Sequence, residues 1–411
     1  MKILLVNKFH YYKGGSETYY FALDELLRKH GHTVIHFAMK DEKNLGSETS
    51  EYFVSNVDLN SAGGIVNKIK TVKNMFYSRE AHKKMKALLE KERPDIVHLG
   101  LVHKHLTYSI LEAIKEYNIP VVQSVHDMIF VCPCYTMLTG GQNCEKCVGG
   151  STFGCIKKKC VKGSTAKSLL AVLENWYIER KKYYNQIDLF ITECNFYKEI
   201  LERSQFTKSR IVNIPNFLPP SKRIELIKEK GDYFLFFGRF SPEKGIMTLL
   251  SAYEKVKTGT PLILVGGGPI SEEVKAFIEE YEMQEKVTLA GYVYDKEMEK
   301  LLRGAKAVIV PSEWYENCPY SIIEAMGKSR IIISSDVAGL PELVEEGRTG
   351  FLFETRNADS LAEKIKIVEE LSDSEYVSMC EETYDFSQKV FSPDAYYEKI
   401  IGLYEELIEQ R

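Results

Sequence analysis

Short apolar runs alternate with longer segments of mixed polarity along almost the whole chain. The first run, KILLVN, covers residues 2–7 and precedes a predicted helix over 16–30. Apolar runs of similar length return at 32–38, 95–100, 120–126 and 188–194, with predicted helices over 65–93 and 108–117 among them. Apolar strands interleaved with helices are typical of parallel sheets covered on both faces.

A second series of the same kind follows the Pro-rich segment IPNFLPPS, residues 214–221. Predicted strands alternate with helices that include 245–257 and 271–281, and a pair of helices ends the chain; the strands cover 233–239, 261–267, 286–292, 307–311 and 330–336. The two series predict an α/β protein with two Rossmann-like, doubly wound domains facing a cleft. We expect one domain over 1–217, completed by a C-terminal helix over 395–411, and the other over 218–394.

The composition is that of an ordinary globular protein. The chain has 411 residues, of which 44% are hydrophobic and 27% charged, enough for two or three domains. No apolar run reaches the 18 residues or so that a membrane-spanning helix needs. The apolar part of the first segment is too short for a signal peptide, so we expect a cytoplasmic protein.

Charge is distributed unevenly along the chain. Up to Pro220 there are 31 Lys and Arg against 22 Asp and Glu, and after it 23 against 36. Basic clusters with aromatic neighbours, such as Phe76, Tyr77, Trp176 and Tyr177, suit contact with an anionic membrane surface. Solvated helix faces are the alternative, and no nucleic-acid-binding module accompanies the charge, so we expect no nucleic acid partner.

The segment EWYENCPYSIIEAM, residues 313–326, contains two carboxylates eight positions apart. It follows an apolar strand and opens a helix. With a loop at 317–319, Glu316 would lie just before the helix and Glu324 two turns inside it. A strand–loop–helix junction of this kind suits binding of polyols and phosphates. A surface helix with two solvated glutamates is the alternative.

Two glycine-containing turns follow strands of the second series. GRFSPEKG, residues 238–245, has a sharp turn at Gly238 and two cations, Arg239 and Lys244, that could reach one anion together. The next turn, VGGGPI, includes Gly267 and permits close approach of a ligand to the backbone. The alternative for the first turn is a pair of exposed cations.

Two features of the first series also suggest a ligand site. A Gly14–Gly15 pair follows the first strand; it is not part of a G-x-G-x-x-G fingerprint, but its amides could cradle a phosphate. His126 and Asp127 end the strand PVVQSVHD, at the edge where ligands of parallel sheets bind. A simple tight turn and a structural histidine are the alternatives.

Together, these motifs resemble the retaining nucleotide-sugar glycosyltransferases of the GT-B fold, glycosyltransferase family 4, over essentially the whole chain. The most specific stretch is EWYENCPYSIIEAMGKSRIIISSDVAGLPELVEEGRTGFLF, with its paired glutamates, AGLPELV and a turn between Gly347 and Gly350. The resemblance implies transfer of a hexose or related sugar from a nucleoside diphosphate donor to a hydroxyl of a glycan or polyprenyl-linked acceptor. Such an enzyme would serve cell-surface polysaccharide synthesis.

The resemblance also implies roles for single residues. Arg239 and Lys244 should bind the donor diphosphate, and Gly15 its distal phosphate. Glu324 should hold the ribose, Glu316 the 3-hydroxyl of the sugar, and the turn 291–293 the base. We expect the catalytic residues His126, Arg239, Lys244 and Glu316, and the donor-binding residues Gly14, Gly15, Gly238, Gly267, Val293, Asn317, Cys318, Pro319, Tyr320 and Glu324.

No catalytic metal is expected. Two cations and helix-end amides can neutralise a departing diphosphate, and no D-x-D triplet precedes a donor-site strand. An epimerase that acts on sugar nucleotides and a catalytically silent sugar-nucleotide-binding regulator are the alternatives. The paired glutamates with Arg239 and Lys244 favour an active transferase.

Six of the nine cysteines fall within residues 132–160, a predicted insertion beside the acceptor site. They are Cys132, Cys134, Cys144, Cys147, Cys155 and Cys160. The spacing of the last four is near that of zinc ligands, and disulfides are rare in the cytoplasm. A structural zinc at Cys144, Cys147, Cys155 and Cys160 is therefore the first interpretation, with disulfides and free thiols as alternatives. Related enzymes often carry cysteines here, although Cys134 is not at an expected position.

Overall fold

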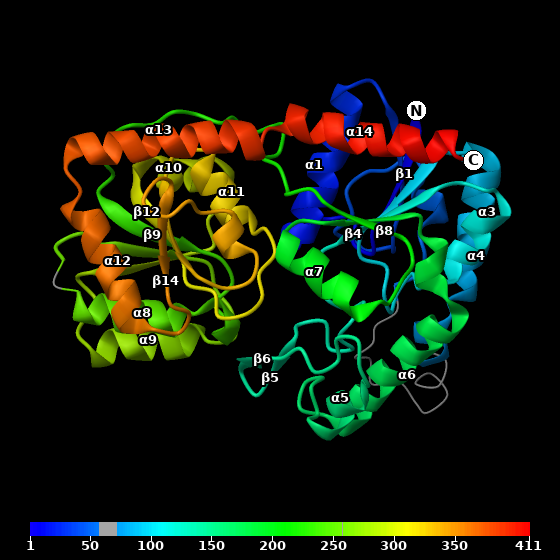
Figure 1. Ribbon diagram of the computed structural model, residues 1–411, viewed down its shortest axis with the longest axis horizontal. Coiled ribbons are helices and arrows are strands. Elements are labelled where there is room, and N and C mark those ends of the chain that lie inside the picture. Colours follow the sequence, from blue (N-terminus) through cyan, green and yellow to red (C-terminus); the bar gives the residue numbers. More distant parts are fainter. Residues whose placement is uncertain (57–71, 257) are drawn as a thin grey trace.

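The computed structural model describes residues 1–56, 72–256 and 258–411. Two six-stranded parallel sheets, each with helices on both faces, form two lobes side by side (Figure 1). The expected α/β architecture with two doubly wound units is therefore confirmed.

The sheet of the first lobe has the order β2-β1-β3-β4-β7-β8. Its strands are β1 (Lys2–Val6), β2 (Thr33–Phe37), β3 (Ile96–Leu99), β4 (Val121–Val125), β7 (Leu189–Thr192) and β8 (Arg210–Asn213). The inner strands are buried because helices cover both faces; these helices include α1 (Gly15–Lys29), α3 (Arg79–Glu92), α4 (Ser109–Glu116) and α7 (Asn195–Ser204). The strand β8 was not predicted, because its short sequence RIVN is only half-buried at the sheet edge.

The sheet of the second lobe has the order β11-β10-β9-β12-β13-β14. Its strands are β9 (Tyr233–Phe237), β10 (Leu262–Val265), β11 (Val287–Gly291), β12 (Ala305–Val310), β13 (Ile331–Ser335) and β14 (Gly350–Phe353). Its helices include α8 (Ile246–Lys255), α9 (Ser271–Glu280), α10 (Asp295–Gly304), α11 (Tyr320–Met326) and α12 (Ala358–Glu370). The chain winds outward in both directions from β9, so the crevice for a ligand lies at the carboxyl ends of β9 and β12.

Two long helices at the end of the chain connect the lobes. Helix α13 (Asp373–Val390) covers the second lobe, and α14 (Pro393–Glu409) continues across the first (Figure 1). The hydroxyl groups of Tyr396 in α14 and Tyr19 in α1 are 2.6 Å apart, and the Tyr396 ring packs 4.2 Å from that of Phe217. The last helix thus contributes to the core of the first lobe.

The predicted helix over 65–93 is wrong as a single element. Residues 57–71 lie outside the described part. Helix α3 starts only at Arg79, because Ser78 is extended and its side chain accepts a hydrogen bond from the amide of Ala81. Three of the four aromatic residues expected beside the basic clusters are half-buried: Phe76 packs edge-on against Tyr177, and the Tyr77 hydroxyl donates to Glu112.

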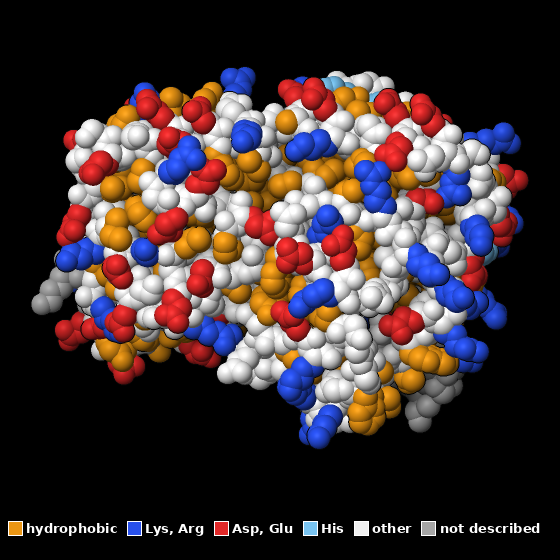
Figure 2. All heavy atoms as spheres, in the orientation of Figure 1, with side chains coloured by type: hydrophobic (Ala, Val, Ile, Leu, Met, Phe, Trp, Pro, Cys, Tyr) orange, Lys and Arg blue, Asp and Glu red, His pale blue; other side chains and the backbone are white. Residues whose placement is uncertain are grey.

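The cysteine-rich insertion forms the lower end of the first lobe. It contains the hairpin β5 (Leu138–Thr139) and β6 (Gln142–Asn143) and the short helix α5 (Phe153–Lys157), and helix α6 (Thr165–Lys181) follows. Figure 2 shows hydrophobic and basic side chains gathered at this end of the molecule. Within the described ranges, no helix combines the length and hydrophobicity needed to cross a bilayer.

Candidate active site

A cleft of about 1590 Å³ opens between the carboxyl edges of the two sheets. Loops after β1 and β4 line it from the first lobe, and loops after β9, β10, β11 and β12 from the second. All the expected site residues line this cleft: Gly14, Gly15, His126, Gly238, Arg239, Lys244, Gly267, Val293, Glu316, Asn317, Cys318, Pro319, Tyr320 and Glu324. The fold therefore brings together residues that are up to 310 positions apart in sequence.

Glu316 and Lys244 form an ion pair on the second-lobe wall. The Lys244 ammonium lies 2.5 Å from the Glu316 carboxylate, which also accepts a hydrogen bond of 2.7 Å from the Ser312 hydroxyl. Burial by itself would raise the pKa of Glu316, but Lys244, the nearby Trp314 side chain and the hydrogen bond from Ser312 lower it below its ordinary value. Glu316 is therefore ionised at neutral pH and able to accept hydrogen bonds from hydroxyls.

Glu324 stands further along the same wall. Helix α11 has only seven residues, so Glu324 lies about one turn inside it rather than the two turns predicted. Its carboxylate is 2.7 Å from the ammonium of Lys222, whose side chain is 44% exposed. An exposed lysine is easily displaced, so ligand hydroxyls could take its place on Glu324.

Glycine is required where the turns of this wall meet. Gly245 has φ 67°, and a Cβ there would lie 1.8 Å from the carbonyl oxygen of Pro311. Gly266 has φ 128°, and a Cβ there would lie 1.9 Å from the carbonyl oxygen of Gly238. Only glycine lets the loop after β9 pack against the loops after β10 and β12, and this packing places Arg239 and Lys244 on the cleft.

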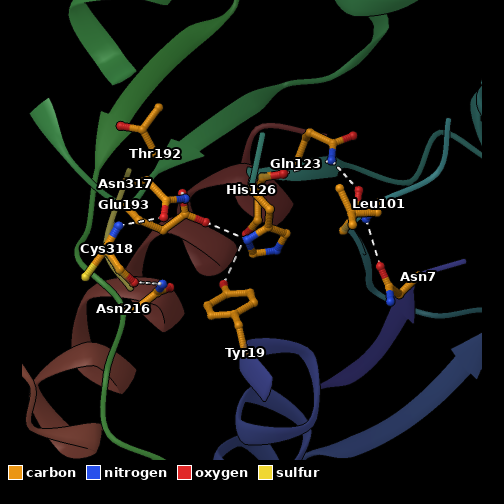
Figure 3. Close-up of polar contacts among 12 residues, drawn as sticks. Asn7, Tyr19, Leu101, Gln123, His126, Thr192, Glu193, Asn216, Asn317 and Cys318 are labelled. Carbon is orange, nitrogen blue, oxygen red and sulfur yellow. Dashed lines mark hydrogen bonds and ion pairs between the residues drawn. The ribbon is translucent and has the colours of Figure 1, made fainter. Parts of the chain in front are cut away.

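His126 contacts a buried carboxylate, Glu193, that was not predicted from the sequence. The Glu193 carboxylate, at the end of β7, lies 2.7 Å from His126 Nδ1 (Figure 3). Burial is the largest single influence on the pKa of His126 and lowers it, but Glu193, with smaller contributions from Glu17 and Asp127, more than offsets burial, and the pKa is raised. Glu193 directly follows the largely apolar strand β7. The sequence ITEC does not indicate that its side chain faces a histidine at the end of another strand, so the contact could not be predicted.

The loop after β12 is tied to the first lobe as well. The Asn317 side-chain amide donates to Glu193 at 3.0 Å, and the Asn216 amide donates to the carbonyl of Cys318 at 3.1 Å (Figure 3). Both bonds cross between the lobes, so the position of this loop depends on both domains.

Two exposed tyrosines, Tyr292 and Tyr294, flank Val293 on the cleft. They are 67% and 68% exposed, and their nearly parallel rings lie 6.4 Å apart. The resemblance assigned this turn to the base, but nothing in the sequence indicated that its two rings would be exposed. Exposed aromatic rings on a cleft wall are suited to stacking against a planar ligand.

Models of two glycosyltransferase families match the chain. The one described as "Glycosyltransferase Family 4" matches residues 13–222, and the one described as "Glycosyl transferases group 1" matches 219–385. Sucrose-phosphate synthase from Thermosynechococcus elongatus superimposes with a TM-score of 0.71 at 18% identity, covering 100% of both chains. Anabaena HepE in complex with UDP superimposes with 0.67 at 16% identity, over 99% of this chain and 100% of its own.

This chain is a glycosyltransferase of the GT-B fold. Among curated relatives, an uncharacterized protein in the cps region of Klebsiella pneumoniae is 21% identical over 98% of this chain and 100% of its own. The putative colanic acid biosynthesis glycosyltransferase WcaL of Escherichia coli is 22% identical over 54% of this chain and 58% of its own. The domain boundaries expected from the sequence stay a prediction, although the two family models meet at residues 219–222.

The cysteines of this glycosyltransferase lie outside the residues that line the cleft, apart from Cys318. All nine are free thiols in the structure, and Cys132 and Cys134 approach each other with their sulfurs 3.3 Å apart. In the described part of the chain, no three Cys, His, Asp or Glu side chains are arranged to hold a metal ion. The zinc site expected at Cys144, Cys147, Cys155 and Cys160 stays a prediction, and no step of the proposed chemistry depends on it.

The Lys244–Glu316 pair makes a prediction about stability. It contributes above the ordinary glutamate pKa of about 4.3 and is lost as the pH falls through the lowered pKa of Glu316. Lys244→Met leaves a buried carboxylate without its cation, which should cost about 3 kcal/mol at pH 7. Without Lys244, burial should raise the pKa of Glu316, so this cost should shrink as acid protonates the carboxylate. Urea unfolding across pH measures both effects.

A matched control is Lys255→Met, which removes an exposed pair with Asp359 and should cost at most about 1 kcal/mol. A Lys244→Met variant with wild-type stability at pH 7, or with a deficit that grows on acidification, would contradict the prediction.

Proposed function

We propose that the protein transfers a sugar from a nucleoside diphosphate donor to a hydroxyl of a glycan or lipid-linked acceptor, with retention of the anomeric configuration and without a catalytic metal. One observation carries this proposal: Arg239, Lys244 and the first residues of α11 face one cleft together with Gly14 and Gly15 of the opposite lobe. Cations and free amides that converge in this way match the charge and oxygens of a diphosphate.

The diphosphate would lie between Arg239 and Lys244. Arg239 is on the cleft and, within residues 1–56, 72–256 and 258–411, has no carboxylate within ion-pair distance. Lys244 is held in place by Glu316 and by the Trp314 ring, whose centroid is 5.5 Å from the ammonium. Fixed cations stabilise the charge that develops on a leaving diphosphate, which is the work that a bound metal does elsewhere.

The remainder of the donor would extend to either side of the diphosphate. Glu324 would accept bonds from the ribose hydroxyls in place of Lys222, and the base would lie along Val293 with Tyr292 or Tyr294 beside it. Glu316 would accept a hydrogen bond from the 3-hydroxyl of the sugar. HepE has been crystallised in complex with UDP and with UDP-glucose, which supports a nucleotide-sugar donor here.

The acceptor would enter from the first lobe, where His126 lines the cleft. His126 would then lie near the reacting carbon of the sugar. Relatives in this family are named for colanic acid and lipopolysaccharide synthesis. We therefore propose an acceptor of cell-surface polysaccharide synthesis, handled at the inner face of the cell membrane. Retention is carried over from the family 4 resemblance, and NMR of the product's anomeric proton tests it.

We also propose that the lower end of the first lobe contacts anionic lipid. On α6, Leu169, Leu173 and Trp176 lie on one face and are 45%, 43% and 57% exposed. Lysines at 157–159, 162 and 167 are exposed nearby. An exposed apolar stripe beside lysines is the composition of an interfacial helix.

Arg239→Ala should lower kcat/KM by about 10²–10³-fold, the range for losing one donor to a developing anion. A screen of nucleotide sugars by thermal shift would first identify the donor. A donor hydrolysis assay would then distinguish a transferase from an epimerase or from a catalytically silent protein that only binds sugar nucleotides. Arg348→Ala, an exposed arginine paired with Glu345 and Glu382 away from the cleft, is the control. Wild-type turnover by Arg239→Ala would refute the diphosphate assignment.

Turnover should persist in EDTA, because Arg239 and Lys244 supply the charge that Mg²⁺ supplies elsewhere. Strict dependence on added Mg²⁺ or Mn²⁺ would overturn the metal-free proposal. The zinc prediction is separate: because Cys144, Cys147, Cys155 and Cys160 have nearly the spacing of zinc ligands, elemental analysis of the purified protein should find about one zinc per chain. A content well below one rejects that site.

Sedimentation with vesicles tests the membrane contact. Each engaged lysine or arginine contributes about 1 kcal/mol, so binding to phosphatidylserine-containing vesicles should weaken as salt rises. Leu169→Ser/Leu173→Ser/Trp176→Ser should weaken it further. Equal binding to neutral and anionic vesicles, or none to either, would remove the proposal and leave the transferase assignment standing.

A further inference from the structure

Glu193 is one of the most deeply buried acids of the molecule. Its side chain is 2% exposed, at the end of β7, and it does not line the cleft. Its two carboxylate oxygens contact different lobes: Oε1 is 2.7 Å from His126 Nδ1, and Oε2 accepts a hydrogen bond of 3.0 Å from Asn317 (Figure 3). Burying a carboxylate is costly unless partners compensate its charge, so these two contacts account for its presence.

The contact with His126 acts through charge. No hydrogen-bond donor is well aligned with Glu193 Oε1 in the described ranges, so the pair is an ion pair rather than a directed bond. A negative charge beside Nδ1 favours a proton on that nitrogen, in the neutral as well as in the charged imidazole. Nε2 is then the nitrogen left for a ligand in the cleft that His126 lines.

Other groups around His126 do not replace this effect. Glu17 on α1 and the neighbouring Asp127 also act to raise the pKa of His126, but less than Glu193 does. His98 on β3 is buried, its own pKa is lowered to about 3, and it is therefore neutral. The Tyr19 ring lies edge-on, 4.9 Å from the imidazole, and fixes its plane without adding charge.

The contact with Asn317 links His126 to the donor-binding loop. Asn317 opens the segment NCP that precedes α11, and its side-chain oxygen accepts a hydrogen bond of 2.6 Å from the amide of Cys318. One carboxylate therefore holds both the histidine of the first lobe and the loop of the second. A displacement of either one would remove one of the two contacts that compensate the buried charge of Glu193.

We propose that Glu193 is a positioning residue of the transfer reaction, which orients His126 toward the donor sugar and couples it to the donor loop through Asn317. This inference rests on the proposed function, in which His126 faces the sugar near the reacting carbon. Glu193 itself touches neither donor nor acceptor.

The alternative is a purely structural tie between the lobes. The molecule offers a matched control, because Glu342 also joins them: it accepts hydrogen bonds from the backbone amides of Asn195 and Phe196 at 2.7 and 2.8 Å. Glu342 contacts neither His126 nor the cleft. Glu342→Gln therefore weakens the junction without changing the charge beside the histidine.

The first experiment is an NMR titration of His126 in the full chain, with and without UDP, in wild type, Glu193→Gln and Glu342→Gln. The charge of Glu193 raises the pKa of His126, so Glu193→Gln should make the histidine titrate at lower pH, and Glu342→Gln should not. An unchanged titration in Glu193→Gln overturns the proposal. This arm needs no donor, so it can be decided even if no transferase activity is found.

The second experiment is a double-mutant cycle on turnover, with UDP-glucose as the first donor tried. Glu193→Gln should lower kcat by about 10–100-fold, as loss of an orienting partner does, with KM for the donor nearly unchanged. In a His126→Ala background it should have little further effect, because the residue it positions is gone.

Equal losses in both backgrounds, or a loss matched by Glu342→Gln, would show a structural tie only. Asn317→Ala, which breaks the other contact of Glu193, should instead raise KM. If the wild-type protein turns over no nucleotide sugar, the proposed function is wrong. The NMR titration of His126 then remains the test of the electrostatic part of the inference.

Discussion

The site exists because parallel strands place every strand-to-helix loop at the same edge of a sheet. Two such sheets face each other here, so loops that follow strands of both sheets converge on one cleft. A continuous apolar cluster that includes Tyr19, Phe217 and Tyr320 joins the two lobes. Helix α14 also connects them, because it follows the second lobe in sequence and packs on the first. Without that return helix, Tyr19 would lose its partner Tyr396, and the ring that supports His126 would be less constrained.

Two buried carboxylates, Glu316 and Glu193, fix the positions of charged groups at the cleft. Glu316 relies on Lys244, and Glu193 relies on His126 and Asn317. In both cases burial makes the charge expensive, so the partners cannot move freely. Preorganisation of this kind suits an enzyme that stabilises developing charge with fixed groups rather than by reorganising them during the reaction.

The cysteine-rich insertion also reaches across the cleft. Asn143 donates a hydrogen bond of 3.1 Å to the carbonyl of Glu313, and the Tyr315 hydroxyl donates one of 2.9 Å to Glu145. The insertion thus borders the donor loop as well as the first lobe. Its contacts are with the backbone and side chains next to Glu316, which gives it a route to influence the site whatever the state of its thiols.

The sequence by itself determined the alternation of strands and helices, the two-domain fold and the cleft residues, because apolar periodicity and glycine-bearing turns are local properties. His126, Arg239 and Glu316 could be found because each follows an apolar strand at the edge where ligands bind. Only the tertiary structure decided the break at Ser78, the exposure of Tyr292 and Tyr294, the joining of α14 to Tyr19, and the pairing of Glu193 with His126. These features depend on which distant segments meet. A carboxylate at the end of a strand has the same sequence signature whether it faces solvent or a histidine on the neighbouring strand.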